Sequence, residues 1–217
     1  MLLSHRYQFL FVHIAKTGGT SVRAALNPLR WRDPLYYLSL PAHKISGLTE
    51  HKLGLKFPRH AHVIAAREML PAAYFDSLYK FAFVRNPWDL QVSSFYHIQR
   101  ERPQLMNGIS DFNEFMRFKF DSERTYQYHI DTSLSLQSDY LVDLHGEQLV
   151  DFVGKYETLH EDFDSICRHL SLPSVKLPHK RAATDRERDY RKYYEDDVAD
   201  LVARYFERDI SILNYQF

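Results

Sequence analysis

Short apolar runs alternate with helical patterns along this chain of 217 residues. Three runs rich in aromatic and β-branched side chains predict buried strands, at residues 9–14, 78–84 and 149–156. The clearest helical pattern near the end of the chain consists of Val198, Leu201, Val202, Tyr205 and Phe206. Strands that alternate with helices predict an α/β fold with a central parallel sheet flanked by helices.

Turn and cap residues place further helices between these runs. A helix from residue 20 is expected to end at Asn27, because Pro28 pushes the residue before it out of the α region. Pro87 suits the first position of a helix that follows the second strand. Ser110 or Asp111 could cap a short helix further on.

Composition indicates one folded domain. Hydrophobic residues make up 45% of the chain and aromatic residues 15%, which suits a globule with a sizeable core over residues 1–217. Residues 31–58 and 100–135 are weakly periodic and are expected to be insertions. The only cysteine, Cys167, falls on the apolar face of a predicted helix and is interpreted as a core residue.

Charge and hydropathy restrict the possible partners. Lys and Arg number 28, as do Asp and Glu, so the chain as a whole has no attraction for a nucleic acid polymer and any anion site must be local. No apolar run approaches the about 20 residues of a membrane helix, and residues 1–16 lack the features of a leader peptide. A cytoplasmic protein without a transmembrane segment is therefore expected.

The segment FLFVHIAKTGGTS, residues 9–21, has the features of an anion-binding loop. A buried strand enters a turn in which Gly18 and Gly19 let the backbone approach a ligand closely, and a helix follows. Backbone N–H groups at a helix N-terminus, with Lys16 beside them, favour a phosphate-like anion. Lys16 precedes the glycines, whereas the lysine of the common P-loop follows the last glycine.

A second anion site is predicted after the second strand. Arg85 ends that strand, and Ser93 lies about two helical turns later on the same side of the following helix. A guanidinium group and a hydroxyl suit a phosphate. Ligands of parallel sheets bind at the carboxyl ends of the strands, so the two sites together fit a nucleoside with phosphates at both ends.

These motifs resemble those of carbohydrate-type, sulfotransferase family 2-like enzymes, including bacterial ones, which use 3′-phosphoadenosine 5′-phosphosulfate. F-x-H-I-x-K-T-G-G-T-S is similar to their phosphosulfate loop, and R-N-P-W-D-L-Q-V-S-S-F-Y, from Arg85 to Tyr96, to their 3′-phosphate motif. The segment F-V-G-K-Y-E-T-L at residues 152–159 extends the likeness. Leu90 departs from the pattern, because the carbohydrate-type enzymes usually carry a further arginine there.

The resemblance implies transfer of a sulfuryl group to a hydroxyl or amine of a carbohydrate or related small acceptor, without a metal. Lys16 would stabilise the charge that develops on the leaving phosphate. Residues 31–58 and 100–135 would face the acceptor. The residues implied to bind the donor are Lys16, Thr17, Gly18, Gly19, Thr20, Ser21, Arg85, Ser93, Tyr156, Lys180 and Arg181.

A hydroxyl acceptor also needs a base, and histidine titrates near neutral pH. Among 12 histidines, the resemblance favours His62 and then His60, with His97 as the next candidate, while a purely structural role stays open for each. Two other functions also stay open. One is a nucleotide-dependent phosphotransferase, although no acidic residue stands at a plausible magnesium position beside the loop; the other is a non-catalytic relative that binds glycans or anions.

Overall fold

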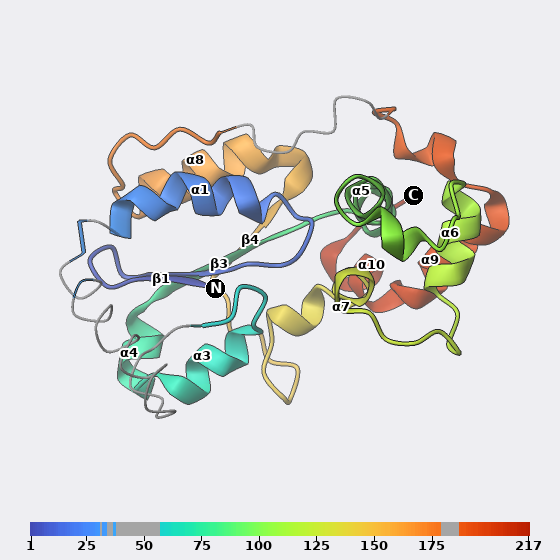
Figure 1. Cartoon of the computed structure of the whole chain (residues 1–217). Coiled ribbons are helices and arrows are strands. Elements are labelled where there is room, and N and C mark those ends of the chain that lie inside the picture. The colour runs from blue at the N-terminus through green and yellow to red at the C-terminus, as the bar shows by residue number, and fades with distance from the viewer. Residues whose placement is uncertain (31, 34–36, 38–56, 179–186) are drawn as a thin grey trace. The chain divides into compact units, whose positions relative to one another are not determined.

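The computed structural model describes residues 1–30, 32–33, 37, 57–178 and 187–217 (Figure 1). The chain forms two compact units, each of which is described by itself. The first consists of Met1–Ile14, Gly18–Val84 and Asp139–Lys180, and the second of Ala15–Thr17, Arg85–Ser138 and Arg181–Phe217. The expectation of one sulfotransferase-like domain over residues 1–217 stays a prediction.

The first unit contains a four-stranded sheet in the order β1-β2-β3-β4. The strands are β1 (Leu2–Ser4), β2 (Phe9–Val12), β3 (Tyr79–Val84) and β4 (Phe152–Lys155). β2, β3 and β4 are parallel, and β1 is antiparallel to β2. The predicted α/β class with a mostly parallel sheet is confirmed. The edge strand β1 was not predicted, because three residues are too few to show an alternating pattern.

Helices cover both faces of this sheet (Figure 1). On one face lie α1 (Gly19–Arg30) and α8 (Leu159–His169), and on the other α3 (Val63–Met69) and α4 (Ala72–Ser77). A short 3₁₀ turn, Tyr156–Thr158, joins β4 to α8. The core between the sheet and the first pair of helices is built from Phe9, Phe11, Phe81, Phe83, Val22, Leu26, Phe163 and Ile166. This core fixes the strand ends from which the loops of interest begin.

The predicted end of the first helix is wrong. α1 contains Pro28 and continues to Arg30 instead of ending at Asn27. A proline costs a helix one N–H donor, and near the C-terminus only the last turn is affected. Leu29, which lies beyond the proline, is buried in the core beside Val22 and Leu26, so its burial offsets that cost.

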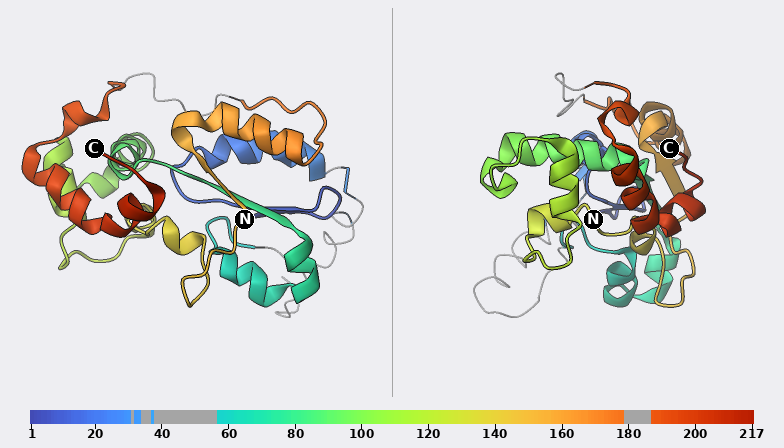
Figure 2. Two further views of the ribbon diagram at one scale, coloured as in Figure 1. Left: turned by 180° about the vertical axis from the view of Figure 1, so that it is seen from behind. Right: turned by 90° about the vertical axis from the view of Figure 1, so that its right-hand side faces the viewer.

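The second unit is helical (Figure 2). Its helices are α5 (Pro87–Glu101), α6 (Phe112–Lys119), α7 (Tyr128–Asp131), α9 (Asp196–Tyr205) and α10 (Glu207–Leu213), with 3₁₀ turns at Pro103–Met106 and Tyr190–Tyr193. A further 3₁₀ turn covers Ser138–Tyr140. None of the helices in the described part of the chain has the length and apolar character needed to cross a bilayer.

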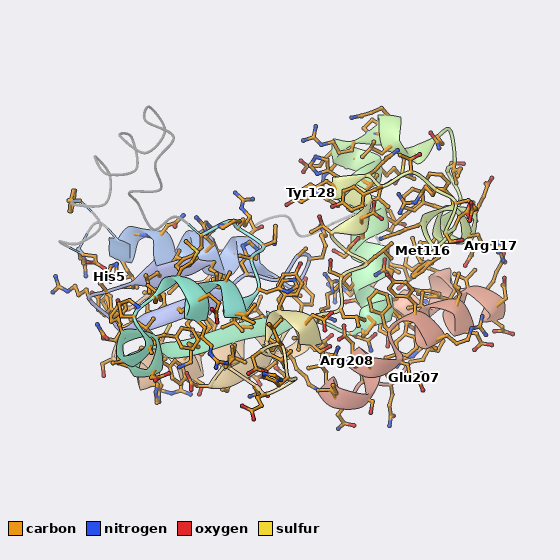
Figure 3. The ribbon with its side chains drawn as sticks, turned by 90° about the horizontal axis from the view of Figure 1, so that it is seen from below. His5, Met116, Arg117, Tyr128, Glu207 and Arg208 are labelled. Atoms are coloured by element: carbon orange, nitrogen blue, oxygen red, sulfur yellow. The ribbon has the colours of Figure 1, made fainter. Side chains whose placement is uncertain are left out.

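Packing in this unit explains how the weakly periodic residues 100–135 fold. Phe95 of α5 packs against Phe112 and Phe115 of α6 in one buried cluster. Of the two predicted caps, Asp111 is the one used: its Oδ1 accepts the N–H of Glu114 at 2.8 Å. At the surface, Arg117 of α6 pairs with Asp197 at 2.9 Å and with Glu195, both at the start of α9 (Figure 3).

Candidate functional site

The loop between β2 and α1 turns on Gly18. This residue has a φ of +81°, in the left-handed region that favours glycine. Its carbonyl accepts the N–H of Ser21 at 2.9 Å, which starts α1. A Cβ at position 18 would lie 2.8 Å from Cδ2 of Leu159 and 3.1 Å from Cδ2 of Tyr156. Tyr156, one of the residues that the resemblance implies to bind the donor, therefore lies against the loop.

Gly19 is required by the close approach of a histidine. A Cβ at position 19 would lie 2.1 Å from Cδ2 of His13, closer than any real contact. The His13 ring is stacked on Phe11, with ring centroids 5.6 Å apart, so it cannot retreat without disturbing the core. Burial, helped by the nearby His60, lowers the pKa of His13 to about 2. His13 therefore stays neutral and shapes the loop.

His60 lies next to His13, with ring centroids 4.7 Å apart. Its Nδ1 is 2.9 Å from the backbone oxygen of His13. A carbonyl can only accept, so Nδ1 carries the proton and Nε2 has the lone pair. Burial lowers the pKa of His60 below its usual value, although the hydrogen bond to His13 acts in the opposite direction. The neutral ring has the tautomer and the protonation state of a base.

His62 lies directly before α3, at the N-cap position. Its ring centroid is 4.2 Å from that of Tyr140. Burial lowers its pKa, and the charge of Asp139 opposes this effect. His62 is thus also neutral near pH 7. Of the two histidines, His60 is the one linked to the loop, because it packs against His13, which lies against Gly19.

The second unit contains the lysine of the loop and the arginine of the second motif. Arg85 donates from Nη1 to the backbone oxygen of Lys16 at 3.0 Å, although 69 positions separate them. Lys16 has a φ of +66°, which is uncommon for a residue with a side chain. The structure therefore brings together the two residues that the sequence predicts to hold the two ends of the donor.

Arg85 is buried and firmly held. Its Nε and Nη2 lie 2.8 and 2.7 Å from Oδ2 of Asp89, one helical turn further on. The Gln137 side chain accepts from the N–H of Arg85 and donates to its carbonyl, both at 2.8 Å. Asp209, itself buried, accepts the backbone N–H of Gln137 at 2.7 Å. These contacts fix the guanidinium group before any ligand arrives.

Three residues that position Arg85 had no role assigned from sequence patterns. Asp89 stands four residues after an arginine at the start of a predicted helix, which is a recognisable ion-pair spacing. Gln137 and Asp209 carry no such signal, because their contacts span 52 and 72 positions. The contacts of Gln137 with Arg85 and of Asp209 with Gln137 are visible only in the folded chain.

The remaining predicted residues have the following places. Thr17 and Ser21 are buried, while Thr20 and, on α5, Ser93 and His97 are half-buried. Leu90 is buried on α5, so the position that departs from the family pattern belongs to the core. Lys180, Arg181 and most of residues 31–58 lie outside the described residues. Within the described ranges, no group of three or more His, Cys, Asp or Glu side chains could hold a metal ion.

Comparison with known proteins identifies the class. A model of the sulfotransferase family matches residues 1–216, and the chain belongs to that family. Its structure is similar to the crystal structure of a sulfotransferase from Alicyclobacillus acidocaldarius, with a TM-score of 0.52 and 15% identity over 100% of this chain and 98% of that chain. At this identity the likeness shows the fold alone. A search for individual curated relatives gave no match. The family assignment indicates an enzyme that transfers a sulfuryl group.

Proposed function

We propose that this chain transfers the sulfuryl group of 3′-phosphoadenosine 5′-phosphosulfate to a hydroxyl, or an amine, of a carbohydrate or related small acceptor. The observation that carries the proposal is the contact between Arg85 and Lys16. It joins the residues that resemble the family's 3′-phosphate and phosphosulfate motifs. The bound donor supplies an activated sulfuryl group and leaves as adenosine 3′,5′-bisphosphate.

The residues of the two motifs have distinct proposed roles. The Lys16 ammonium and the N–H groups at the start of α1 stabilise negative charge on the leaving 5′-phosphate oxygen. Arg85 and Ser93 bind the 3′-phosphate, while Asp89 holds the guanidinium in place. Tyr156, which packs against Gly18, contacts the adenine.

His60 is the proposed general base, with His62 as the alternative. Nε2 of His60 accepts the proton of the attacking hydroxyl, because Nδ1 already donates to His13. His60→Ala should lower kcat/KM by at least about a hundredfold, which is typical for loss of a general base, without a matching change in binding of the bisphosphate. If His60→Ala retained full turnover and His62→Ala did not, the base would be His62.

Binding of adenosine 3′,5′-bisphosphate, measured by titration calorimetry, tests the donor site. Charge-assisted hydrogen bonds contribute about 1.5–3 kcal/mol, so Lys16→Ala and Arg85→Ala should each weaken binding by about ten- to hundredfold. Lys192→Ala and Arg100→Ala, at exposed positions, are matched controls. Undiminished binding by the double variant Lys16→Ala, Arg85→Ala would remove this site assignment.

Two further measurements separate the alternatives and identify the acceptor. Sulfuryl transfer from this donor should persist in EDTA, whereas a nucleotide-dependent phosphotransferase needs Mg²⁺ and should stop. A glycan- or anion-binding relative would bind the bisphosphate and release no product. Donor labelled with sulfur-35, incubated with the glycans, lipids and small metabolites of a cell extract, should label the true acceptor.

A further inference from the structure

Residues 214–217 follow α10 and belong to the second unit. Asn214 ends α10 with a φ of +53°, a left-handed conformation that is common at helix C-termini. Tyr215 is buried, and its N–H donates to the carbonyl of Ile210 at 3.0 Å. In Figure 1 the end of the chain marked C lies beside α5. The segment 214–217 therefore has a defined place next to the helix that follows Arg85.

Asn86, the N-cap residue of α5, is buried and uses both ends of its side-chain amide. Its Oδ1 accepts the N–H of Trp88 at 3.1 Å and so caps the helix. Its Nδ2 donates to the backbone oxygen of Gln216 at 2.8 Å and to the hydroxyl of Tyr190 at 3.1 Å. The Tyr190 hydroxyl in turn donates to the same Gln216 oxygen at 3.3 Å. One side chain therefore ties the start of α5 to the segment 214–217.

The ring of Phe217 packs among three other aromatic rings. Its centroid lies 5.3 Å from that of Trp88, 5.6 Å from that of Tyr194 and 6.0 Å from that of Tyr190. The Tyr194 hydroxyl also donates to the carbonyl of Trp88 at 2.8 Å. Phe217 keeps 43% of its surface exposed, so this ring can be removed without opening a cavity in the core. Aromatic contacts thus hold Phe217 on the first turn of α5.

The first turn of α5 also determines where the guanidinium of Arg85 points. Two of its nitrogens bond to Asp89, which lies on that turn. Asn86 and Trp88, the residues in contact with the segment 214–217, stand at the start of the same turn. Misplacement of a positioning group by about 1 Å can cost about a hundredfold. A shift of this turn would therefore weaken whatever Arg85 binds.

We propose that the segment 214–217 positions Arg85 for the 3′-phosphate of the donor. The inference rests on the proposed function, because it needs a 3′-phosphate at that arginine. The segment acts through Asn86 and Trp88, which it holds with the Gln216 carbonyl and the Phe217 ring. Docking of the segment and binding of the 3′-phosphate therefore stabilise each other. Recognition of the 5′-phosphate, at the loop before α1, does not depend on this contact.

Calorimetric titration with two nucleotides tests the proposal. Phe217→Ala removes the ring, and Asn86→Ser keeps an N-cap residue but loses the donor to Gln216. Each variant should bind adenosine 3′,5′-bisphosphate about tenfold more weakly and adenosine 5′-phosphate as tightly as the natural chain does. Phe217→Tyr, which retains the ring, and Ile212→Ala, exposed on α10, should bind both nucleotides normally. An equal loss for both nucleotides, or no loss, would overturn the inference.

Hydrogen exchange tests the reciprocal effect in the natural chain. By linkage, the factor by which the docked segment tightens binding is also the factor by which the ligand stabilises docking. Each nucleotide is used at about 100 times its Kd, so that both stabilise the whole chain equally. Exchange of the Tyr215 amide, which donates to Ile210, should then be about tenfold slower with the bisphosphate than with adenosine 5′-phosphate. Equal rates would contradict this inference alone. Failure of the bisphosphate to bind would contradict the proposed donor site, and the inference with it.

Discussion

Gly19 and His13 are fitted to each other at the start of α1, so a single added methyl group should disturb the loop. In Gly19→Ala the new Cβ would meet the His13 ring at 2.1 Å, and the ring is held by Phe11 and His60. We expect the loop to shift and binding of adenosine 3′,5′-bisphosphate to weaken at least about tenfold, since misplaced ligating groups are costly. Titration calorimetry measures the change. Gly108→Ala is the control for binding: space around the new Cβ is open but φ is +79°, so this variant should cost some stability and leave binding of the bisphosphate unchanged.

A double variant can show that the clash is the cause. Adding His13→Ala to Gly19→Ala removes the ring that the methyl group would meet, so the double variant should bind more tightly than Gly19→Ala alone. Strictly additive losses would mean that the two residues act independently, and the close packing would not explain why glycine is needed at position 19.

His13 should also make stability depend on pH. Its pKa is about 2 in the folded chain and 6.5 in the unfolded chain, so between these values the unfolded chain binds more protons. Stability therefore falls as the pH drops below 6.5, by up to about 1.4 kcal/mol per pH unit from this group. Urea unfolding at several pH values down to about 5 measures the slope. In His13→Gln the slope should be shallower by this amount; an unchanged slope would show that His13 does not stay neutral.

Gln137 holds in place the short segment that joins β3 to α5. Its side chain satisfies both backbone groups of Arg85, which are buried. Gln137→Ala would leave a buried N–H and a buried C=O without their partners, at a cost of about 2–5 kcal/mol of unfolding free energy. Denaturant unfolding measures this cost, and calorimetry should show weaker binding of the bisphosphate. Gln99→Ala, exposed on α5, should change stability by less than about 0.5 kcal/mol. A similarly small effect at Gln137 would contradict its proposed role.

The elements that sequence patterns predicted are those whose signals are local. β2 and β3 are runs of large apolar residues, and Asp111 caps α6 with its own side chain, so both kinds of signal can be read within a few residues. The end of α1 at Asn27 was predicted wrongly, because a local rule about proline ignored the distant core that holds Leu29.

The features of the candidate site also fall into those that a local sequence signal predicts and those that depend on distant contacts. The loop glycines and Arg85 follow from motifs that a short stretch of sequence carries. That the two motifs serve one ligand was expected because both follow parallel strands, whereas the hydrogen bond from Arg85 to the Lys16 carbonyl was not predicted. The tautomer of His60 and the support from Gln137 and Asp209 could not be predicted. They depend on backbone atoms that only the folded chain brings together.

For the whole molecule, a ligand that binds only the folded chain must raise its stability, and two related ligands can show which phosphate matters. Adenosine 3′,5′-bisphosphate at about 100 times its Kd should stabilise the chain by about 2.7 kcal/mol and raise Tm by about 5–10 °C. Adenosine 5′-phosphate, which lacks the 3′-phosphate, should give a smaller rise at the same concentration. Differential scanning calorimetry measures both.

Replacement of Arg85 tests whether this residue causes the difference in stabilisation between the two nucleotides. If Arg85 binds the 3′-phosphate, both nucleotides should stabilise the Arg85→Ala variant to the same small extent. The reason is that the 3′-phosphate, which distinguishes the two nucleotides, has lost its partner. Arg100→Ala, at an exposed arginine, should still distinguish them as the natural chain does. A variant at position 85 that continued to prefer the bisphosphate would mean that other groups recognise the 3′-phosphate. Formal net charge is zero, so such recognition would again have to come from a local set of cations.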